Sequence, residues 1–389
     1  MKLPKRRGHG HHDFDQDMLA MMAEGIDKLT AAGMGEDEAH KVAADAWVQA
    51  TDAQAPAVAA QLRRTAPKML RRRHRGGKLF RRALKVYWGR PLDLYLATWV
   101  GAHDAGERFD SRLAAQAEER QDYHFEVLTG LYARACRTAL EVHHDLAGGF
   151  PMAALARCRT LHEIAVIMLV LAEFGETAEH ADLAERFYLH DLVLNAKDAK
   201  TYQEHCDELG SEPLADEEIT ELEQARQELL TRFGTDYKES YGWASGVGGL
   251  RRPNFAQLEK LVKVAHLRGH YSWASHEIHA DARGAQLNVF ERGDILYKQT
   301  GPMLFDLAEP ATWALASLEL CVTTLLHSTD DVSALEMTGS KALQHLIVDA
   351  KEMFEQTEAY VEEMENRVHL WPRWRRELWT RWRLLVQPF

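Results

Sequence analysis

The seven residues from Arg157 to Glu163 (Arg-Cys-Arg-Thr-Leu-His-Glu) place cationic, acid–base and carboxylate side chains on one predicted helix. At about 100° per residue, His162 lies about 60° from Arg159, and Glu163 lies one turn beyond Arg159. A histidine can transfer a proton to or from a ribose hydroxyl while guanidinium groups stabilise charge on phosphorus, which is the chemistry of metal-independent RNA cleavage. The candidate catalytic residues are therefore Arg157, Arg159, His162 and Glu163.

The same residue types also fit a structural role. Arg159 and Glu163 would then form a buried ion pair, and His162 would be a hydrogen-bonded core residue. Arg157 lies about 140° from His162, so a joint site needs its long side chain or a second subunit. An open, positively charged cleft around these residues would favour catalysis, whereas burial with mutual hydrogen bonds would favour the structural role.

Polar residues further along the chain could complete a pocket. Tyr271, Ser275 and His279 are the second-choice pocket residues, and Arg186 and His190 are the third choice. Ser275 and His279 are four residues apart and share a face of a predicted helix. The alternative is that these side chains tie one helix to another.

The sequence contains no strong metal or cofactor motif. His276 and His279 share a helix face, but a metal site there would need ligands from another helix. A di-iron bundle needs two Glu-x-x-His helices, and only the one that starts at Glu141 has this spacing. There is no Cys-x-x-Cys, P-loop, Rossmann glycine pattern or Gly-x-Ser-x-Gly. We expect no metal and no cofactor.

Positive charge is concentrated in one segment, from Arg63 to Arg90. This segment holds twelve Lys and Arg residues and no Asp or Glu, and removing them from the net charge of −12 leaves −24 on the rest of the chain. Counterion release would favour binding of this segment to a polyanion. The candidate nucleic-acid-binding residues are Arg71, Arg72, Arg73, Arg75, Lys78, Arg81 and Arg82. The alternative is that the basic face docks on the acidic remainder of the same chain or of a second copy.

The C-terminal tail interleaves Trp and Arg from Trp371 to Arg383. Such a tail could stack bases and contact phosphates. Aromatic stripes at helical spacing are more often buried, so a helix that closes the bundle or a dimer is favoured. The tail and the wide separation of Arg157 from His162 predict a homo-oligomer, most simply a homodimer.

Helices must position these residues. Strong helix formers fill long stretches between Gly and Pro, and alternating β-branched residues are scarce, so we predict an all-α multi-helix bundle. The basic segment is expected to end at Gly89-Arg90-Pro91, and Asp110-Ser111 to cap a helix that Gly148-Gly149 ends. A central helix should run from Phe150-Pro151 to Phe174-Gly175, and Asp216 should cap another.

These elements suggest three parts: a basic N-terminal region (1–95), a bundle that carries the motifs (96–330) and C-terminal helices with the Trp/Arg tail (331–389). The 46% hydrophobic content is sufficient for a core. The longest apolar run has about nine residues, too few for a membrane span, and the basic N-terminus has no apolar stretch behind it. With four scattered cysteines, the composition predicts a cytoplasmic protein without membrane association.

Four motifs in order resemble a family of uncharacterised, all-helical bacterial proteins. They occupy residues 156–163 with Arg-x-Leu-His-Glu, 184–190, 233–243 with Tyr-Gly-Trp, and 271–279 with Tyr-x-x-x-Ser-x-x-x-His. The resemblance covers about residues 123–281. Arg157-x4-His162 also resembles the R-x4-H motif of the HEPN superfamily, whose small helical domains often act as metal-independent ribonucleases in toxin and anti-phage systems. In active HEPN proteins a polar residue commonly follows the Arg, and here that residue is Cys158.

The HEPN resemblance implies a metal-independent endoribonuclease or an RNA-binding effector in bacterial defence or stress. RNA, a second copy of the chain and a partner protein of a defence system are the expected partners. The alternative from a different class is a non-catalytic helical protein for interaction or oligomerisation.

Overall fold

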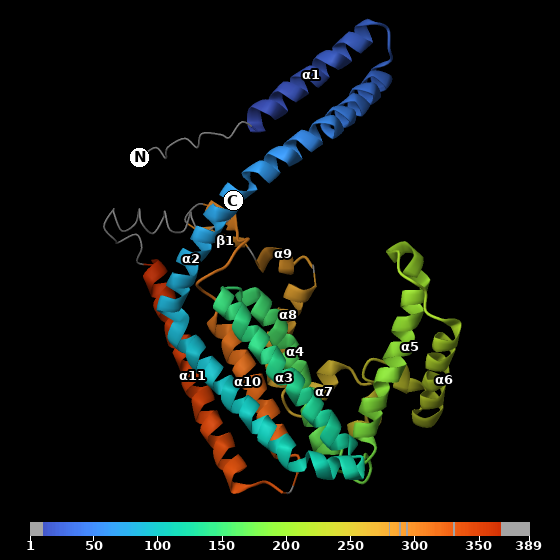
Figure 1. The fold of residues 1–389 in the computed structure, drawn as a ribbon, viewed down its shortest axis with the longest axis vertical. Helices are drawn as coiled ribbons and strands as arrows, with labels where there is room; N and C mark the ends of the chain where they lie inside the picture. The colour runs from blue at the N-terminus through green and yellow to red at the C-terminus, as the bar shows by residue number, and fades with distance from the viewer. Residues whose placement is uncertain (1–10, 280, 288, 293–294, 330, 367–389) are drawn as a thin grey trace. The chain divides into compact units, whose positions relative to one another are not determined.

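The computed structural model describes residues 11–279, 281–287, 289–292, 295–329 and 331–366 (Figure 1). They belong to two compact units, residues 1–76 and 77–389, each described here by itself. The Trp/Arg tail lies outside the described residues. The predicted boundaries at 95/96 and 330/331 remain predictions.

The first unit consists of α1 (His11–Ala31) and the first part of α2 (Glu36–Arg120). Gly33, at φ 92°, provides the left-handed conformation of the turn between them. Ala39 and Ala43 are buried in this unit. From Val58 to Arg75, however, every side chain of α2 is exposed or half-exposed. This stretch of helix therefore has no apolar core of its own.

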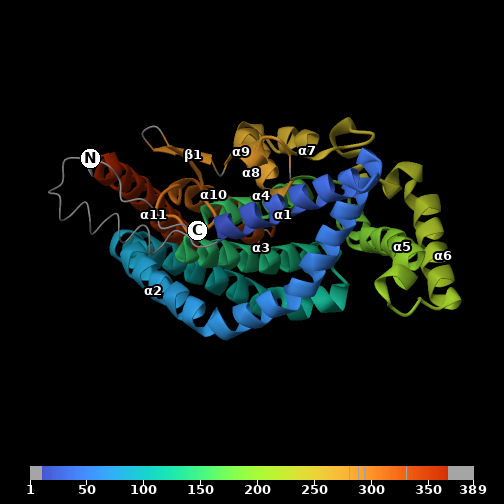
Figure 2. The same cartoon turned by 90° about the horizontal axis from the view of Figure 1, so that it is seen from above.

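The second unit is a bundle of the rest of α2 with α3 (Tyr123–Gly148), α4 (Pro151–Phe174), α10 (Ala308–Leu326) and α11 (Ala334–Asn366). Figures 1 and 2 show these helices side by side. The core cluster draws side chains from all five. Buried residues of α4 point in every direction around its axis, as Ala165, Val166 and Leu171 do, because other elements surround it. The prediction of an all-α bundle with a central helix is confirmed.

Further helices, 3-10 turns and two strands follow the first half of the bundle. α5 (Leu183–Leu209) and α6 (Asp216–Phe233) form a hairpin, and the 3-10 turns η1 (Thr235–Lys238), η2 (Gly242–Ala244) and η3 (Val247–Gly249) follow α6. Then come α7 (Phe255–Leu261), η4 (Ala265–Leu267), α8 (Arg268–Ile278) and α9 (Gly284–Leu287). An antiparallel pair, β1 (Val289–Arg292) and β2 (Ile295–Lys298), precedes α10, and the sequence did not predict it.

The end of the basic segment at Gly89-Arg90-Pro91 is not the end of a helix, because α2 continues through this point to Arg120. A proline inside a helix costs about 3 kcal/mol. Trp88, Leu92 and Tyr95 lie on one face of α2 on either side of Pro91 and are buried in the core. Burial of each such side chain is worth about 1.5–3 kcal/mol, so packing outweighs the cost of the proline.

The predicted cap at Asp110-Ser111 is wrong, because these residues lie inside α2. The chain instead turns at Gln121, whose φ is 51°, and the side chain of Asp122 caps α3 by accepting hydrogen bonds from the backbone N–H groups of His124 and Phe125. The C-terminal end of α3 was predicted correctly. Gly149 ends it at φ 78°, where a Cβ would lie 2.4 Å from the ring of Phe80.

Asp216 does not cap α6, because the N-cap residue is Ala215 and no side chain supplies the hydrogen bond. Across the part of the chain that the structure describes, no helix is both long enough and apolar enough to cross a bilayer.

Candidate functional site

His162 lies on the inner side of α4 and has no exposed surface. Its Nε2 is 3.0 Å from Oε1 of Glu259 on α7, which is equally buried. Aromatic rings enclose the imidazole: the centroids of Phe255, Tyr271 and Trp313 lie 5.9, 6.2 and 5.8 Å from its own. The histidine of the sequence motif is therefore closed off from solvent.

Glu259 is the anionic partner of this pair. Burial by itself would raise the pKa of its carboxyl group, but the hydrogen bonds from His162 and Arg268 outweigh burial and lower that pKa. Arg268 Nη1 lies 2.8 Å from the second carboxylate oxygen. An ionised carboxylate can only accept, so Nε2 of His162 must donate this hydrogen bond, and Nδ1 is the other nitrogen of the ring. No described atom donates to this buried Nδ1.

A second polar group lies beside the first, around Glu163 on α4. Oε1 of this carboxylate lies 3.2 Å from Nε of Arg159, as the spacing of four residues predicted, and accepts a hydrogen bond of 2.7 Å from the hydroxyl of Tyr271. Burial, followed by the contact with Glu163, raises the pKa of Tyr271 to about 12. The guanidinium carbons of Arg159 and Arg268 each lie 4.7 Å from the centroid of the Tyr271 ring. Every charged group here has a partner.

Arg157 does not join this cluster. Its Nη2 forms an ion pair with Glu141 of α3, and its side chain is 39% exposed. The angle of about 140° between Arg157 and His162 on the helix accounts for this separation. The four motif residues therefore occupy two environments, a buried cluster and a half-exposed ion pair.

The third-choice pocket residues fasten the 3-10 turns to α5. Arg186 is buried and donates from Nη2 to the carbonyl oxygen of Ser245 at 2.6 Å. His190 is buried as well, and its Nε2 lies 2.9 Å from the carbonyl oxygen of Tyr237. Burial lowers the pKa of both side chains. The structure brings neither of them to His162.

The structure does not bring the second-choice pocket residues together. Tyr271 lies in the cluster, but the hydroxyl of Ser275 donates to the carbonyl oxygen of Tyr271 within its own helix. His279 is exposed and follows the end of α8. The two residues therefore do not share the helix face that their spacing predicted.

Potential metal ligands gather elsewhere. His276 pairs with Asp281 at 2.6 Å, and within the described ranges no third ligand approaches both His276 and His279. The one group of three potential ligands found in those ranges is His103, Asp104 and Glu107, on the surface of α2.

The basic segment is accessible to solvent. All twelve of its Lys and Arg side chains are exposed, seven in the first unit up to Arg75 and five in the second from Lys78. None of them forms an ion pair with another described residue. The described acidic residues of each unit thus leave the cations of that unit without an ion-pair partner.

The sequence missed four residues of the cluster around His162: Phe255, Glu259, Arg268 and Trp313. No local signal marks them, because Glu259 follows His162 by 97 residues and lies on a helix of seven residues. Only the tertiary fold brings α4, α7, α8 and α10 together.

Comparisons with known proteins find a family model that matches part of the chain and carries no activity. Residues 125–295, from α3 to β2, match the model of a family described as a family of unknown function (DUF5677). This match agrees with the extent of the motifs found in the sequence and gives no support to a HEPN assignment. No curated protein and no solved structure matches the chain.

Proposed function

We propose that this protein binds RNA through the basic segment of α2 and that the motif from Arg157 to Glu163 stabilises the bundle instead of cleaving RNA. The exposed, acid-free set of twelve cations carries the proposal. Phosphates would neutralise these charges and release counterions, which favours binding to RNA without a requirement for base contacts.

The stretch of α2 from Val58 to Arg75, which packs against no core, supports the same proposal. Seven of the twelve cations lie on it, and none of its side chains is buried. An isolated helix of this length is marginally stable in water, and closely spaced like charges destabilise it further. A polyanion removes the repulsion, whereas a second copy of the same stretch would increase it.

Burial of His162 supports the structural role of the motif. A general acid or base must come within about 3 Å of the proton that it transfers, directly or through one water. His162 has no exposed surface, and its one hydrogen-bonded nitrogen is occupied by Glu259. Arg157, the other half of the R-x4-H pattern, is paired with Glu141.

Binding of the full-length protein to a 5′-labelled single-stranded RNA, measured by fluorescence anisotropy from 50 to 400 mM salt, tests the proposal. The variant Arg71→Gln/Arg72→Gln/Arg73→Gln/Arg75→Gln should bind more weakly. The slope of log K against log salt should fall by about 3, since each lost contact with a single strand removes about 0.7 counterions.

A control variant with the same change of charge replaces Arg108, Arg120, Arg134 and Arg283, which are exposed residues outside the segment, with Gln. Its slope should equal that of the wild type. Equal slopes for both variants would overturn RNA binding by α2. The same samples, run on a denaturing gel with EDTA, should show intact RNA. Fragments ending in a 2′,3′-cyclic phosphate that vanish in His162→Ala would overturn the structural role and restore the ribonuclease.

A further inference from the structure

A large groove lies between α2 and α3, on a different part of the bundle from the buried cluster. Its volume is about 1140 Å³, and its lining residues on α2 run from Trp99 to Glu118. The hydroxyl of Tyr132 donates to the carbonyl oxygen of Ala102, and Nε1 of Trp99 donates to that of Cys136. The two helices thus meet through long aromatic side chains, which leaves space between their backbones.

Apolar side chains in this groove remain uncovered. Tyr123, Leu140 and Tyr188 line it and are 39%, 37% and 50% exposed. The rings of Tyr123 and Tyr188 lie 5.3 Å apart where α3 approaches α5. Surface of this kind, rimmed by polar groups, is typical of a binding site.

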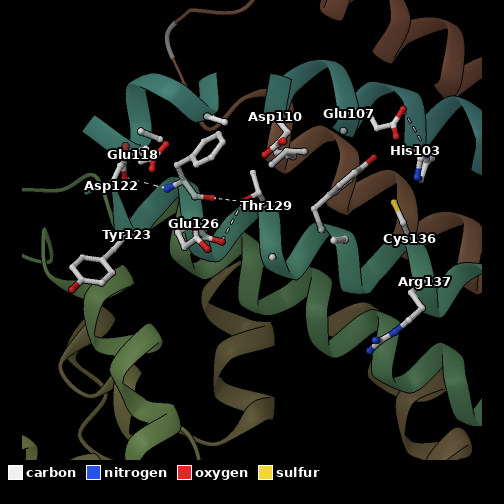
Figure 3. A pocket seen from close by; sticks show the side chains of 18 of the residues that line it. His103, Glu107, Asp110, Glu118, Asp122, Tyr123, Glu126, Thr129, Cys136 and Arg137 are labelled. Carbon is white, nitrogen blue, oxygen red and sulfur yellow. Dashed lines mark hydrogen bonds and ion pairs between the residues drawn. The ribbon is translucent and has the colours of Figure 1, made fainter. Parts of the chain in front are cut away.

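The rim of the groove is acidic. Figure 3 shows carboxylates from both helices around the groove, with Glu107, Asp110 and Glu118 on α2 and Glu126 on α3. Asp110, Glu118 and Glu126 form no ion pair with another described residue. Arg137 is the one Lys or Arg among the lining residues. An occupant must therefore offer aromatic or aliphatic groups together with positive charge, and RNA is excluded.

The chain itself contains a segment of this chemistry. Residues 367–389 hold four Trp and six Arg against one Glu. The tail follows α11, which runs antiparallel to α2: Tyr360 contacts Tyr87, and Glu336 pairs with Arg112. This register places Asn366 level with about residue 81 of α2, roughly 27 Å along the helix from Trp99.

The distance along the chain from Asn366 determines which residues of the tail can reach the groove. Trp379 and Trp382 follow Asn366 by 13 and 16 residues, which span at most roughly 43 and 53 Å in an extended chain. Trp371 reaches roughly 17 Å and falls short. We propose that the groove between α2 and α3 is the docking site of the segment Trp379–Arg383 of the same chain. Covalent attachment makes this contact intramolecular and raises the effective concentration of the segment.

Photocrosslinking of the full-length protein tests which segment occupies the groove. A benzophenone amino acid in place of Leu140 should crosslink to peptides that contain Trp379 or Trp382. In a mixture of unlabelled and ¹⁵N-labelled protein, these crosslinks should join peptides of one isotope. Crosslinks of mixed isotope would make a second copy the occupant, and the absence of tail crosslinks would make the tail irrelevant; either result overturns the proposal.

Limited trypsin digestion tests the charge complementarity. The variant Asp110→Asn/Glu118→Gln/Glu126→Gln should be cut after Arg381 and Arg383 at least about five times faster than the wild type, because the tail loses its anionic partners. The control Glu221→Gln/Glu228→Gln/Glu355→Gln has the same change of charge at exposed sites outside the groove and should be cut like the wild type. Equal rates in all three proteins would overturn the proposal. Asp122 is kept because it caps α3.

Discussion

At the scale of single residues, burial decides what the motif from Arg157 to Glu163 can do. Arginine beside histidine is compatible with phosphoryl chemistry and with a structural ion pair, and residue types alone do not separate the two. His162 and Glu259 are both fully buried, and Arg268 supplies the compensating charge. Removing His162 or Glu259 would leave a buried polar group of the other residue without its hydrogen-bond partner, which is costly.

His162→Ala should therefore lower the free energy of unfolding by about 1–3 kcal/mol, since it leaves a buried carboxylate oxygen of Glu259 without its hydrogen-bond donor. Urea denaturation followed by circular dichroism measures this change. Arg157→Ala is the matched control, because Arg157 is 39% exposed and pairs at the surface with Glu141, so its loss should cost about 1 kcal/mol or less. A fully stable His162→Ala protein would contradict the structural role.

The buried His190 should make the folded protein less stable in weak acid. Burial lowers its pKa below the usual 6.5, and the carbonyl oxygens of Tyr237 and Glu239 only partly oppose this effect. The unfolded chain then binds more protons than the folded chain as pH falls below about 6.5, so stability declines from there through the lower folded pKa. Burial also lowers the pKa of His124 and His143, which adds to the decline.

The midpoint of urea unfolding should accordingly fall between pH 7.5 and pH 5.5. His190→Gln should reduce the size of that fall, because glutamine cannot take up a proton. His205→Gln, at an exposed site on the same helix, should leave it unchanged. An equal fall in wild type and His190→Gln would assign the pH dependence to other groups.

The sequence predicted those contacts of the site that are local. The pair Arg159–Glu163 follows from a spacing of four residues, and the separation of Arg157 from His162 follows from helical geometry. The partner of His162 lies 97 residues further along the chain, so no helical periodicity relates the two. The same holds for Trp313, which α10 brings against the imidazole.

At the scale of elements, apolar periodicity predicted the limits of helices better than single prolines and charged caps did. Both ends of α4 and the end of α3 at Gly149 were predicted, because glycine and the Phe-Pro pair coincide there with the limits of the apolar pattern. The interruptions predicted inside α2 were wrong, since its buried face from Phe80 to Phe109 continues past Pro91. A helix can continue through a proline when the apolar face on both sides of the proline is buried.

The true break between α2 and α3 depends on Asp122. Asp122→Ala should lower the free energy of unfolding by about 0.5–2 kcal/mol, because the N–H groups of His124 and Phe125 lose their acceptor. Ser111→Ala, at the cap that the sequence suggested, should change it by less than about 0.5 kcal/mol, since Ser111 is exposed inside α2. Thermal and urea unfolding of both variants give the comparison, and a larger effect at Ser111 would contradict these helix limits.

At the scale of the whole molecule, opposite charges occupy separate surfaces. The segment from Arg63 to Arg90 carries only positive charge, and the groove between α2 and α3 is rimmed by carboxylates. The sequence predicted the first surface because its charges are contiguous in the chain. It did not predict the second, because the two helices contribute their carboxylates from opposite sides of the groove.

Binding of RNA should stabilise the helical stretch of α2 that has no buried side chains. Between Val58 and Arg75 no side chain is buried, so the backbone hydrogen bonds of this stretch are stabilised only by the helix itself, and their amide hydrogens should exchange rapidly in the free protein. Phosphates remove the repulsion among seven cations. Hydrogen exchange measured by mass spectrometry should therefore slow by at least about tenfold in peptides covering 58–75 when RNA is added.

Two comparisons make this test specific. Peptides from α4, buried in the core, should exchange slowly with and without RNA. The variant Arg71→Gln/Arg72→Gln/Arg73→Gln/Arg75→Gln should exchange more slowly than the wild type when no RNA is present, because it lacks the repulsion, and should gain less protection when RNA is added. Protection by RNA that appears elsewhere and spares residues 58–75 would place the binding surface outside the basic helix and contradict the proposed function.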